Sequence, residues 1–410
     1  MNDSEKQRTS ESAPWVVIAG GVHCLGGTDK ANFALVEYLL ERDIPVEVVA
    51  HEIDRRLLRH PNIRAHLVPV PGGSRLAGEL LLSLLGRRVA HRTTRKDPNS
   101  RVIVNGGNCP WGDINWVHRV HHAWAPEIIN APWVHRLKHH MAVASAKRRE
   151  LQSLRAARLI IANSELTRRH LVELLGLDPK GIETVRLGSD PDCAPSSNAE
   201  RLAARSQLRQ PAHRPMVVFI GAIGYDNNKG LDTLLRAWRD LCCNPQWDAD
   251  LVIAGDGRAL PQWKAMVARS GFHDRVRFLG FTDRIHELLA AADLLVSPVR
   301  YESYGLNVQE ALCRGVPAIV SVGAGVAERY PSNLRDLLLP DPENVDDLVY
   351  RMLIWRSSVD NWRERVAEFS KELRTYSWQD MAERFYRLAI HTESEMSEAS
   401  AVHAIAGGTK

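Results

Sequence analysis

The sequence repeats one pattern from end to end: a short apolar run, a loop with glycine or polar residues, and then a helical stretch. Residues 15–19 (WVVIA) form the first apolar run, and apolar residues recur at helical spacing in 32–40. Strands that alternate with helices favour a parallel sheet covered on both faces, because parallel neighbours need a crossover connection. Later apolar runs in the first half are 46–50, 102–105, 115–120, 159–162 and 184–187.

A polar stretch with four prolines, residues 188–215, interrupts this pattern. The pattern then restarts, with apolar runs at 217–220, 251–254, 276–279, 294–297, 318–321 and 337–339. The chain therefore reads as two similar doubly wound α/β domains. Ligands of such domains bind at the carboxyl ends of the strands, here in a cleft between the domains.

The expected boundaries follow from these shifts in pattern. We place an N-terminal domain at 14–205, a C-terminal domain at 206–375 and a helix at 376–392. The polar ends, 1–13 and 393–410, are predicted to be disordered.

The composition narrows the class of protein. Of 410 residues, 44% are hydrophobic and 25% charged, which is typical of a soluble globular chain. No run approaches the ~18 apolar residues of a membrane helix. The polar start shows no secretory signal, and the six scattered cysteines include no CxxC pair. Both features favour a reduced, cytoplasmic setting.

The charge is uneven along the chain. Residues 1–210 hold 30 basic and 22 acidic residues, whereas 211–410 hold 23 and 27. A basic half suits anionic lipid, a phosphorylated acceptor or nucleic acid, or it is a solvated face; nucleic acid is the weakest reading, because no binding motif accompanies the charge. A basic stretch that could dock peripherally on the inner face of an anionic membrane, or be a solvated loop, is Arg87, Arg88, Arg92, Arg95, Lys96 and Arg101.

Residues 297–321 carry the most informative motif. Glu302 and Glu310 stand eight apart, and the residues between them are expected to open a helix at Ser303, Tyr304, Gly305 and Leu306. A helix N-terminus binds anions such as a diphosphate, and Gly305 allows close approach. Glu310 could then accept hydrogen bonds from a ribose diol, and Glu302 from sugar hydroxyls. Spacing alone fits a capping and surface-charge pattern equally well.

This segment, with Gly315-Val316-Pro317 downstream, strongly resembles the paired-glutamate motif of retaining glycosyltransferases of family 4. The resemblance covers 15–392 and implies the GT-B fold, two Rossmann-like domains with a C-terminal helix that crosses back to the first. It implies a nucleotide-sugar donor, a UDP- or GDP-sugar, in the second domain. It also implies a glycan, lipid-linked or small-molecule acceptor in the first, with no metal and no other cofactor. Glu302 would be catalytic, and the amides of residues 303–306 would hold the diphosphate.

A second motif is the loop from Gly221 to Gly230, which ends in Lys229. A lysine at a strand end is placed to neutralise phosphate, although most loop lysines simply lie in water. The resembled family implies a catalytic role for Lys229 and an arginine after the first glycine, where this chain has Ala222. We hypothesise that Arg300 supplies the missing charge.

Three further loops match the family more weakly. Asp256 follows a strand in a glycine-rich turn, which by itself is more often only a turn. The backbone of Phe281 and Thr282 is expected to border the nucleobase. In the first domain, Gly26 and Gly27 would face the diphosphate and the acceptor. Their loop is not a GxGxxG, which argues against a dinucleotide oxidoreductase.

The acceptor side departs from the family. Asn105 and Asn108 stand in a loop where many members have histidines. His121 and His122 are the remaining candidates, against the plainer reading that they are packed or solvated. We therefore predict a retaining glycosyltransferase of polysaccharide, glycolipid or glycoconjugate synthesis. The alternatives are a sugar-phosphate synthase-like enzyme and a non-catalytic nucleotide-sugar-binding partner in a polysaccharide assembly complex.

Overall fold

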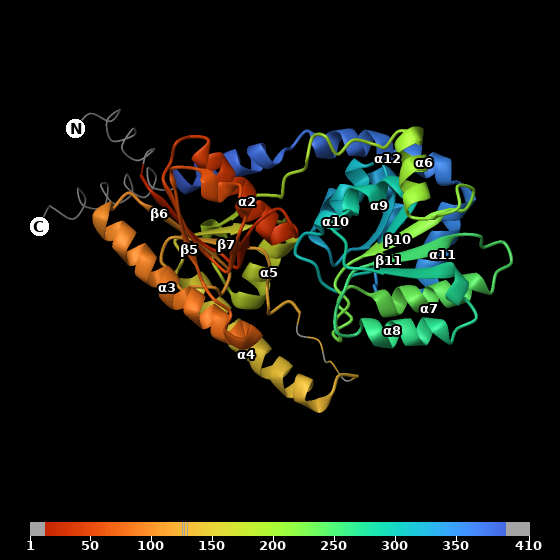
Figure 1. Cartoon of the computed structure of the whole chain (residues 1–410), viewed down its shortest axis with the longest axis horizontal. Helices are drawn as coiled ribbons and strands as arrows, with labels where there is room; N and C mark the ends of the chain where they lie inside the picture. Colours follow the sequence, from red (N-terminus) through yellow and green to blue (C-terminus); the bar gives the residue numbers. More distant parts are fainter. Residues whose placement is uncertain (1–12, 125, 127, 129, 391–410) are drawn as a thin grey trace, which may run out of the picture. The chain divides into compact units, whose positions relative to one another are not determined.

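The computed structural model describes residues 13–390 except 125, 127 and 129 (Figure 1). These residues form two compact units. Unit 1 contains 13–123, 139–188 and 378–390, and unit 2 contains 124–138 and 189–377. The predicted disorder of 1–12 and 393–410 lies outside the described residues. No helix in the described ranges is both long and apolar enough to cross a membrane.

Unit 1 is built on a seven-stranded parallel sheet in the order β5-β3-β1-β6-β7-β8-β9. Four of its inner strands, β1, β6, β7 and β8, are buried along their whole length, as expected for a sheet covered on both faces. The strands are β1 (Trp15–Ile18), β3 (Val46–Ala50), β5 (Ile63–Leu67), β6 (Arg101–Asn105), β7 (Ile114–Val117), β8 (Leu159–Ala162) and β9 (Ile182–Thr184). A short parallel pair is formed by β2 (Gly21–Val22) and β4 (Glu52–Ile53).

The helices of this part of the chain are α2 (Gly27–Leu40), α3 (Arg75–Lys96), α4 (Trp133–Ala156) and α5 (Glu165–Leu175). Short 3-10 turns are η1 (Leu57–Arg59), η2 (Pro71–Gly73) and η3 (Pro179–Gly181). Residues 378–390 are helical and pack on unit 1. Phe385 lies 4.6 Å from Trp116, and Tyr386 stacks 5.5 Å from Trp15, ring centroid to ring centroid. The last helix therefore returns to the first sheet, as the fold class predicts.

Unit 2 repeats the architecture with a six-stranded parallel sheet in the order β12-β11-β10-β13-β14-β15. The strands are β10 (Met216–Ile220), β11 (Asp250–Ala254), β12 (Val276–Gly280), β13 (Leu294–Ser297), β14 (Ala318–Ser321) and β15 (Leu338–Leu339). The helices are α6 (Asn198–Gln207), α7 (Leu231–Cys242), α8 (Leu260–Ala268), α9 (Ile285–Ala291), α10 (Leu306–Cys313), α11 (Val345–Ser357) and α12 (Val359–Arg374). The 3-10 turns are η4 (His273–Arg275), η5 (Gly325–Arg329) and η6 (Ser332–Leu337).

Candidate functional site

The paired-glutamate segment leads from β13 into α10. Gly305 caps this helix in the left-handed region, at φ 104°. A Cβ at Gly305 would lie 3.0 Å from Cγ1 of Val326, so a larger residue is disfavoured by both strain and space. α10 begins at Leu306, and the first N–H groups of a helix have no partner within it. The loop after β13 therefore presents a helix N-terminus, which suits an anion.

The two motifs meet in an ion pair. Nζ of Lys229 contacts Oε2 of Glu302, and the two side chains are 25% and 23% exposed. The stem of Lys229 lies over Gly221, where an added Cβ would stand 3.1 Å from the lysine Cγ. The glycine leaves the space through which the lysine reaches Glu302. A cation and a carboxylate from separate loops are thus placed side by side.

Hydrogen bonds and close packing hold the lysine loop against the glutamate segment. The Asn228 side chain donates from Nδ2 to the carbonyl of Tyr301 at 3.0 Å and accepts the Tyr301 N–H at 3.1 Å. Gly230 has φ 71°, and a Cβ there would stand 1.9 Å from the carbonyl oxygen of Pro298. Only glycine fits at position 230. The loop is therefore held at a fixed distance from Glu302.

Arg300 is engaged by two carboxylates. Its guanidinium, 9% exposed, binds both oxygens of Asp232 at 2.9 and 2.8 Å and Glu343 at 2.8 Å. Burial alone would lower the pKa of Arg300, but hydrogen bonds to Asp232 and Glu343 outweigh it and raise the pKa. The structure thus gives Arg300 partners of its own. Its role as a second diphosphate cation stays a prediction.

The other predicted residues of unit 2 follow the carboxyl ends of neighbouring strands. Asp256, after β11, caps its own turn by accepting the Gly257 N–H at 2.7 Å. Phe281, after β12, is 70% exposed. Thr282 accepts the N–H of Arg284 at 3.1 Å. On α10, Glu310 is partly exposed, whereas Ser303 and Tyr304 in the preceding loop are buried.

In unit 1, the predicted glycines begin α2. Gly26 caps the helix at φ 80°, and Gly27 is its first residue. Asn105 is buried at the end of β6, where its Oδ1 accepts from Nδ2 of Asn32 at 2.9 Å. The N–H of Asn108 donates to the carbonyl of Asn105 at 3.1 Å. Asn105 thus ties a strand end to α2.

A carboxylate that the sequence analysis missed organises the histidines after β7. Glu150, on α4, is fully buried. Its two oxygens accept from Nδ1 of His121 at 2.9 Å and Nδ1 of His122 at 2.8 Å, and the His121 N–H donates at 2.8 Å. Burial alone would raise the pKa of Glu150, but these three hydrogen bonds outweigh it and lower the pKa.

The arrangement assigns the histidine tautomers. A carboxylate accepts only, so each Nδ1 carries a proton and each Nε2 has a lone pair in the neutral ring. The rings are 34% and 26% exposed. The sequence carries little signal for this site, because the buried residues of α4 are Glu150, Ser153 and Leu154, of which only Leu154 is apolar.

Two family models match this chain over the segments that carry the candidate site. A family model described as Glycosyltransferase Family 4 matches residues 25–192, and one described as Glycosyl transferases group 1 matches 214–354. The chain belongs to glycosyltransferase family 4. The predicted family is therefore confirmed.

Named relatives of this family-4 chain match part of it. It is 27% identical over 269 residues to D-inositol 3-phosphate glycosyltransferase of Nocardioides sp., covering 61% of this chain and 57% of the relative. It is 28% identical over 237 residues to O-antigen chain mannosyltransferase B of Escherichia coli, covering 56% and 59%. The chain thus spans little more than half the length of these curated relatives.

The fold has solved counterparts along nearly the whole family-4 chain. The crystal structure of Anabaena HepE in complex with UDP and glucose matches with a TM-score of 0.64 at 18% identity. The match covers 92% of this chain and 99% of HepE. At this identity the likeness shows the fold, which is GT-B, as the sequence resemblance implies.

Proposed function

We propose that the chain transfers a sugar from a nucleotide-sugar to an acceptor hydroxyl and retains the anomeric configuration. The observation that carries this proposal is the pair of Lys229 and Glu302 beside the N-terminus of α10. A helix N-terminus and a lysine suit a diphosphate, and a carboxylate suits sugar hydroxyls. All three features lie in loops that follow the carboxyl ends of β10 and β13, where ligands of α/β sheets bind.

The donor is a UDP- or GDP-sugar. The diphosphate of the donor accepts hydrogen bonds from the amides after Gly305 and from the ammonium of Lys229. The ribose hydroxyls donate to Glu310, on the second turn of α10. The loops with Asp256, Phe281 and Thr282 border the base. UDP in the HepE complex supports the uridine class for this fold.

The main contribution of the protein to this reaction is electrostatic stabilisation of the leaving diphosphate. The bond between the sugar anomeric carbon and the diphosphate oxygen breaks, and the charge that grows on the diphosphate is stabilised by Lys229 and the α10 amides. The acceptor oxygen bonds to the anomeric carbon on the face that the diphosphate leaves, and its proton passes to the leaving phosphate. Water must be excluded, because it would otherwise take the sugar.

On the acceptor side we assign a positioning role to Glu150. It holds His121 and His122 with both Nε2 lone pairs available to acceptor hydroxyls, while Gly26, Gly27 and Asn108 line the neighbouring strand ends. The acceptor is a glycan, a lipid-linked sugar or a small molecule. The E. coli relative, an O-antigen chain mannosyltransferase by name, supports a glycan.

We also propose peripheral contact with an anionic membrane, on its cytoplasmic face, through α3. Leu76, Leu80 and Leu84 recur one turn apart and are 43%, 53% and 66% exposed. The second half of the same helix is rich in arginine, with Arg88 and Arg92 exposed. An apolar stripe beside basic residues fits an anionic lipid surface. Wild type should sediment with anionic but not with neutral vesicles, and the double variant Leu80→Ser, Leu84→Ser should no longer sediment with either. Equal sedimentation of wild type with both lipids would overturn the proposal.

The stereochemistry tests the proposed activity. The product formed from a nucleotide-sugar of known configuration is followed by proton NMR, with Glu302→Gln as the matched inactive variant. Retention in the first product, before any slow equilibration, is the expected result. An inverted product would overturn the retaining mechanism, and nucleotide binding without transfer to any acceptor would overturn the transferase assignment.

A further inference from the structure

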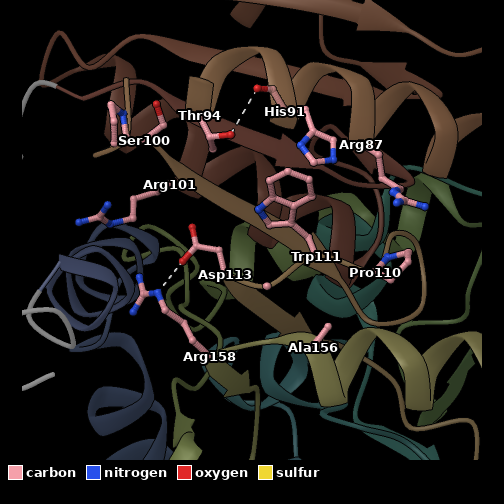
Figure 2. Close-up of a pocket in the computed structure, with 12 residues that line it drawn as sticks. Arg87, His91, Thr94, Ser100, Arg101, Pro110, Trp111, Asp113, Ala156 and Arg158 are labelled. Atoms are coloured by element: carbon pink, nitrogen blue, oxygen red, sulfur yellow. Dashed lines mark hydrogen bonds and ion pairs between the residues drawn. The ribbon is translucent and has the colours of Figure 1, made fainter. Parts of the chain in front are cut away.

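Unit 1 contains a cavity of about 550 Å³, lined by residues of α3 and by residues before β6, β7 and β8 (Figure 2). Arg101 begins β6, Asp113 immediately precedes β7 and Arg158 immediately precedes β8. The cavity therefore lies at the amino-terminal edge of the sheet. The acceptor-side residues follow the carboxyl ends of the same strands, so this cavity is a separate place on the unit.

The lining of this amino-edge cavity is strongly basic. Arg87, Arg101 and Arg158 line it together with His91, against one carboxylate, Asp113. That carboxylate is already used: it accepts Nε of Arg158 at 2.7 Å and the N–H of Val102 at 2.6 Å. The cavity thus keeps a net positive charge.

Two of these arginines also hold the last helix. Nε of Arg101 and Nη2 of Arg158 donate to the carbonyl of Ala389 at 3.3 and 3.2 Å. Helix C-terminal carbonyls lack partners within the helix, so these bonds cap residues 378–390. Arg101 and Arg158 therefore have a structural task at the end of this helix.

Two cationic groups of the cavity have donors to spare. Within the described residues, Nη1 of Arg158 is buried and has no hydrogen-bond partner. Arg87, on α3, forms no ion pair or hydrogen bond with the described part of the chain. A buried guanidinium donor without a partner is costly, and an oxyanion is the ligand that best satisfies it.

An aromatic wall completes the cavity. The rings of His91 and Trp111 meet edge to face, with centroids 4.7 Å apart, and Figure 2 shows Trp111 in the middle of the lining residues. The volume falls within the range of small-ligand sites, roughly 300–1,000 Å³. A cavity lined by aromatic and basic side chains fits an organic molecule that bears an anionic group.

We propose that this cavity binds a phosphate-bearing small molecule. The phosphate contacts the guanidinium of Arg158, whose side chain lines the cavity, the body of the molecule lies along Trp111, and Arg87 contributes from α3. The cavity shares no residue with the proposed donor site, which lies in unit 2, so this proposal does not rest on the proposed transfer reaction.

Fluorine NMR of fluorotryptophan-labelled protein tests this proposal. The Trp111 signal is assigned with Trp111→Phe and followed as inorganic phosphate is added. We expect a saturable shift that persists in Lys229→Met and in Arg88→Gln, a neighbour on α3 outside the cavity lining. In Arg87→Gln and Arg158→Lys the dissociation constant should rise about tenfold, or about 1.4 kcal/mol.

Three results would overturn the proposal. One is a Trp111 signal that phosphate does not move. The second is an equal shift in wild type, Arg87→Gln and Arg158→Lys, which would be a general salt effect. The third is a shift produced only by vesicles of anionic lipid, which would mean that the phosphate comes from a membrane surface. Arg87→Gln changes an exposed side chain, so its folding is expected to stay intact.

Discussion

Lys229→Met isolates the charge at the proposed donor site. Methionine keeps a stem that packs over Gly221 and removes only the ammonium that contacts Glu302. Removing one preorganised group that stabilises transition-state charge costs about 100- to 1,000-fold in rate, or roughly 2.7–4 kcal/mol. The folded protein loses much less, because an ion pair exposed by about a quarter on each side contributes about 1 kcal/mol at most.

The assay compares turnover with stability in the same preparations. Release of nucleoside diphosphate is measured with the donor that wild type uses, and unfolding is followed in urea. Lys264→Met, an exposed lysine on α8, is the matched control and should leave both quantities unchanged. A loss in kcat/KM of less than about tenfold in a folded Lys229→Met would refute the assigned role, because one charged group at a phosphate is worth more than that.

Three further predictions concern single residues. Gly230→Ala should lower the free energy of unfolding in urea by about 2–5 kcal/mol, from left-handed strain and overpacking, whereas Gly271→Ala, with open space around it, should not. Glu150→Gln cannot accept from both histidines, so kcat should fall by up to about 100-fold with donor KM unchanged, and an unchanged kcat would contradict the positioning role. Burial lowers the pKa of His118 to about 3. Below pH ~6.5 this histidine therefore binds a proton in the unfolded chain but stays neutral in the native state. Stability should thus fall by about 2 kcal/mol from pH 7 to pH 5, and by less in His118→Asn; equal losses would contradict this reading.

The sequence was most informative where glycine fixes the backbone. The start of α10 after Gly305 and the loop that ends at Gly230 were both predicted, because positions with positive φ leave a clear mark in the sequence. The family and fold were confirmed from the same motifs. The β5 strand (Ile63–Leu67) was missed because it has no continuous apolar run: Arg64 and His66 alternate with apolar residues, and the strand lies mostly exposed at the sheet edge.

Spacing in the sequence could not predict which distant side chains contact one another. Lys229 and Glu302 are 73 residues apart, and only the parallel neighbours β10 and β13 bring their loops together. The partners of Arg300 and the burial of Glu150 likewise depend on packing between distant elements. A charged residue in a sequence does not reveal which opposite charge will neutralise it.

The most direct test of the central claim, a nucleoside diphosphate bound at α10, is a thermal-shift panel of UDP, GDP, ADP, CMP and dTDP. Wild type is compared with Glu310→Ala and with Glu364→Ala, an exposed glutamate on α12. A ligand at ~100 times its dissociation constant adds ~2.7 kcal/mol of stability. One diphosphate should stabilise wild type and Glu364→Ala strongly and Glu310→Ala weakly. No stabilisation by any nucleotide, or equal stabilisation of all three proteins, would contradict the account.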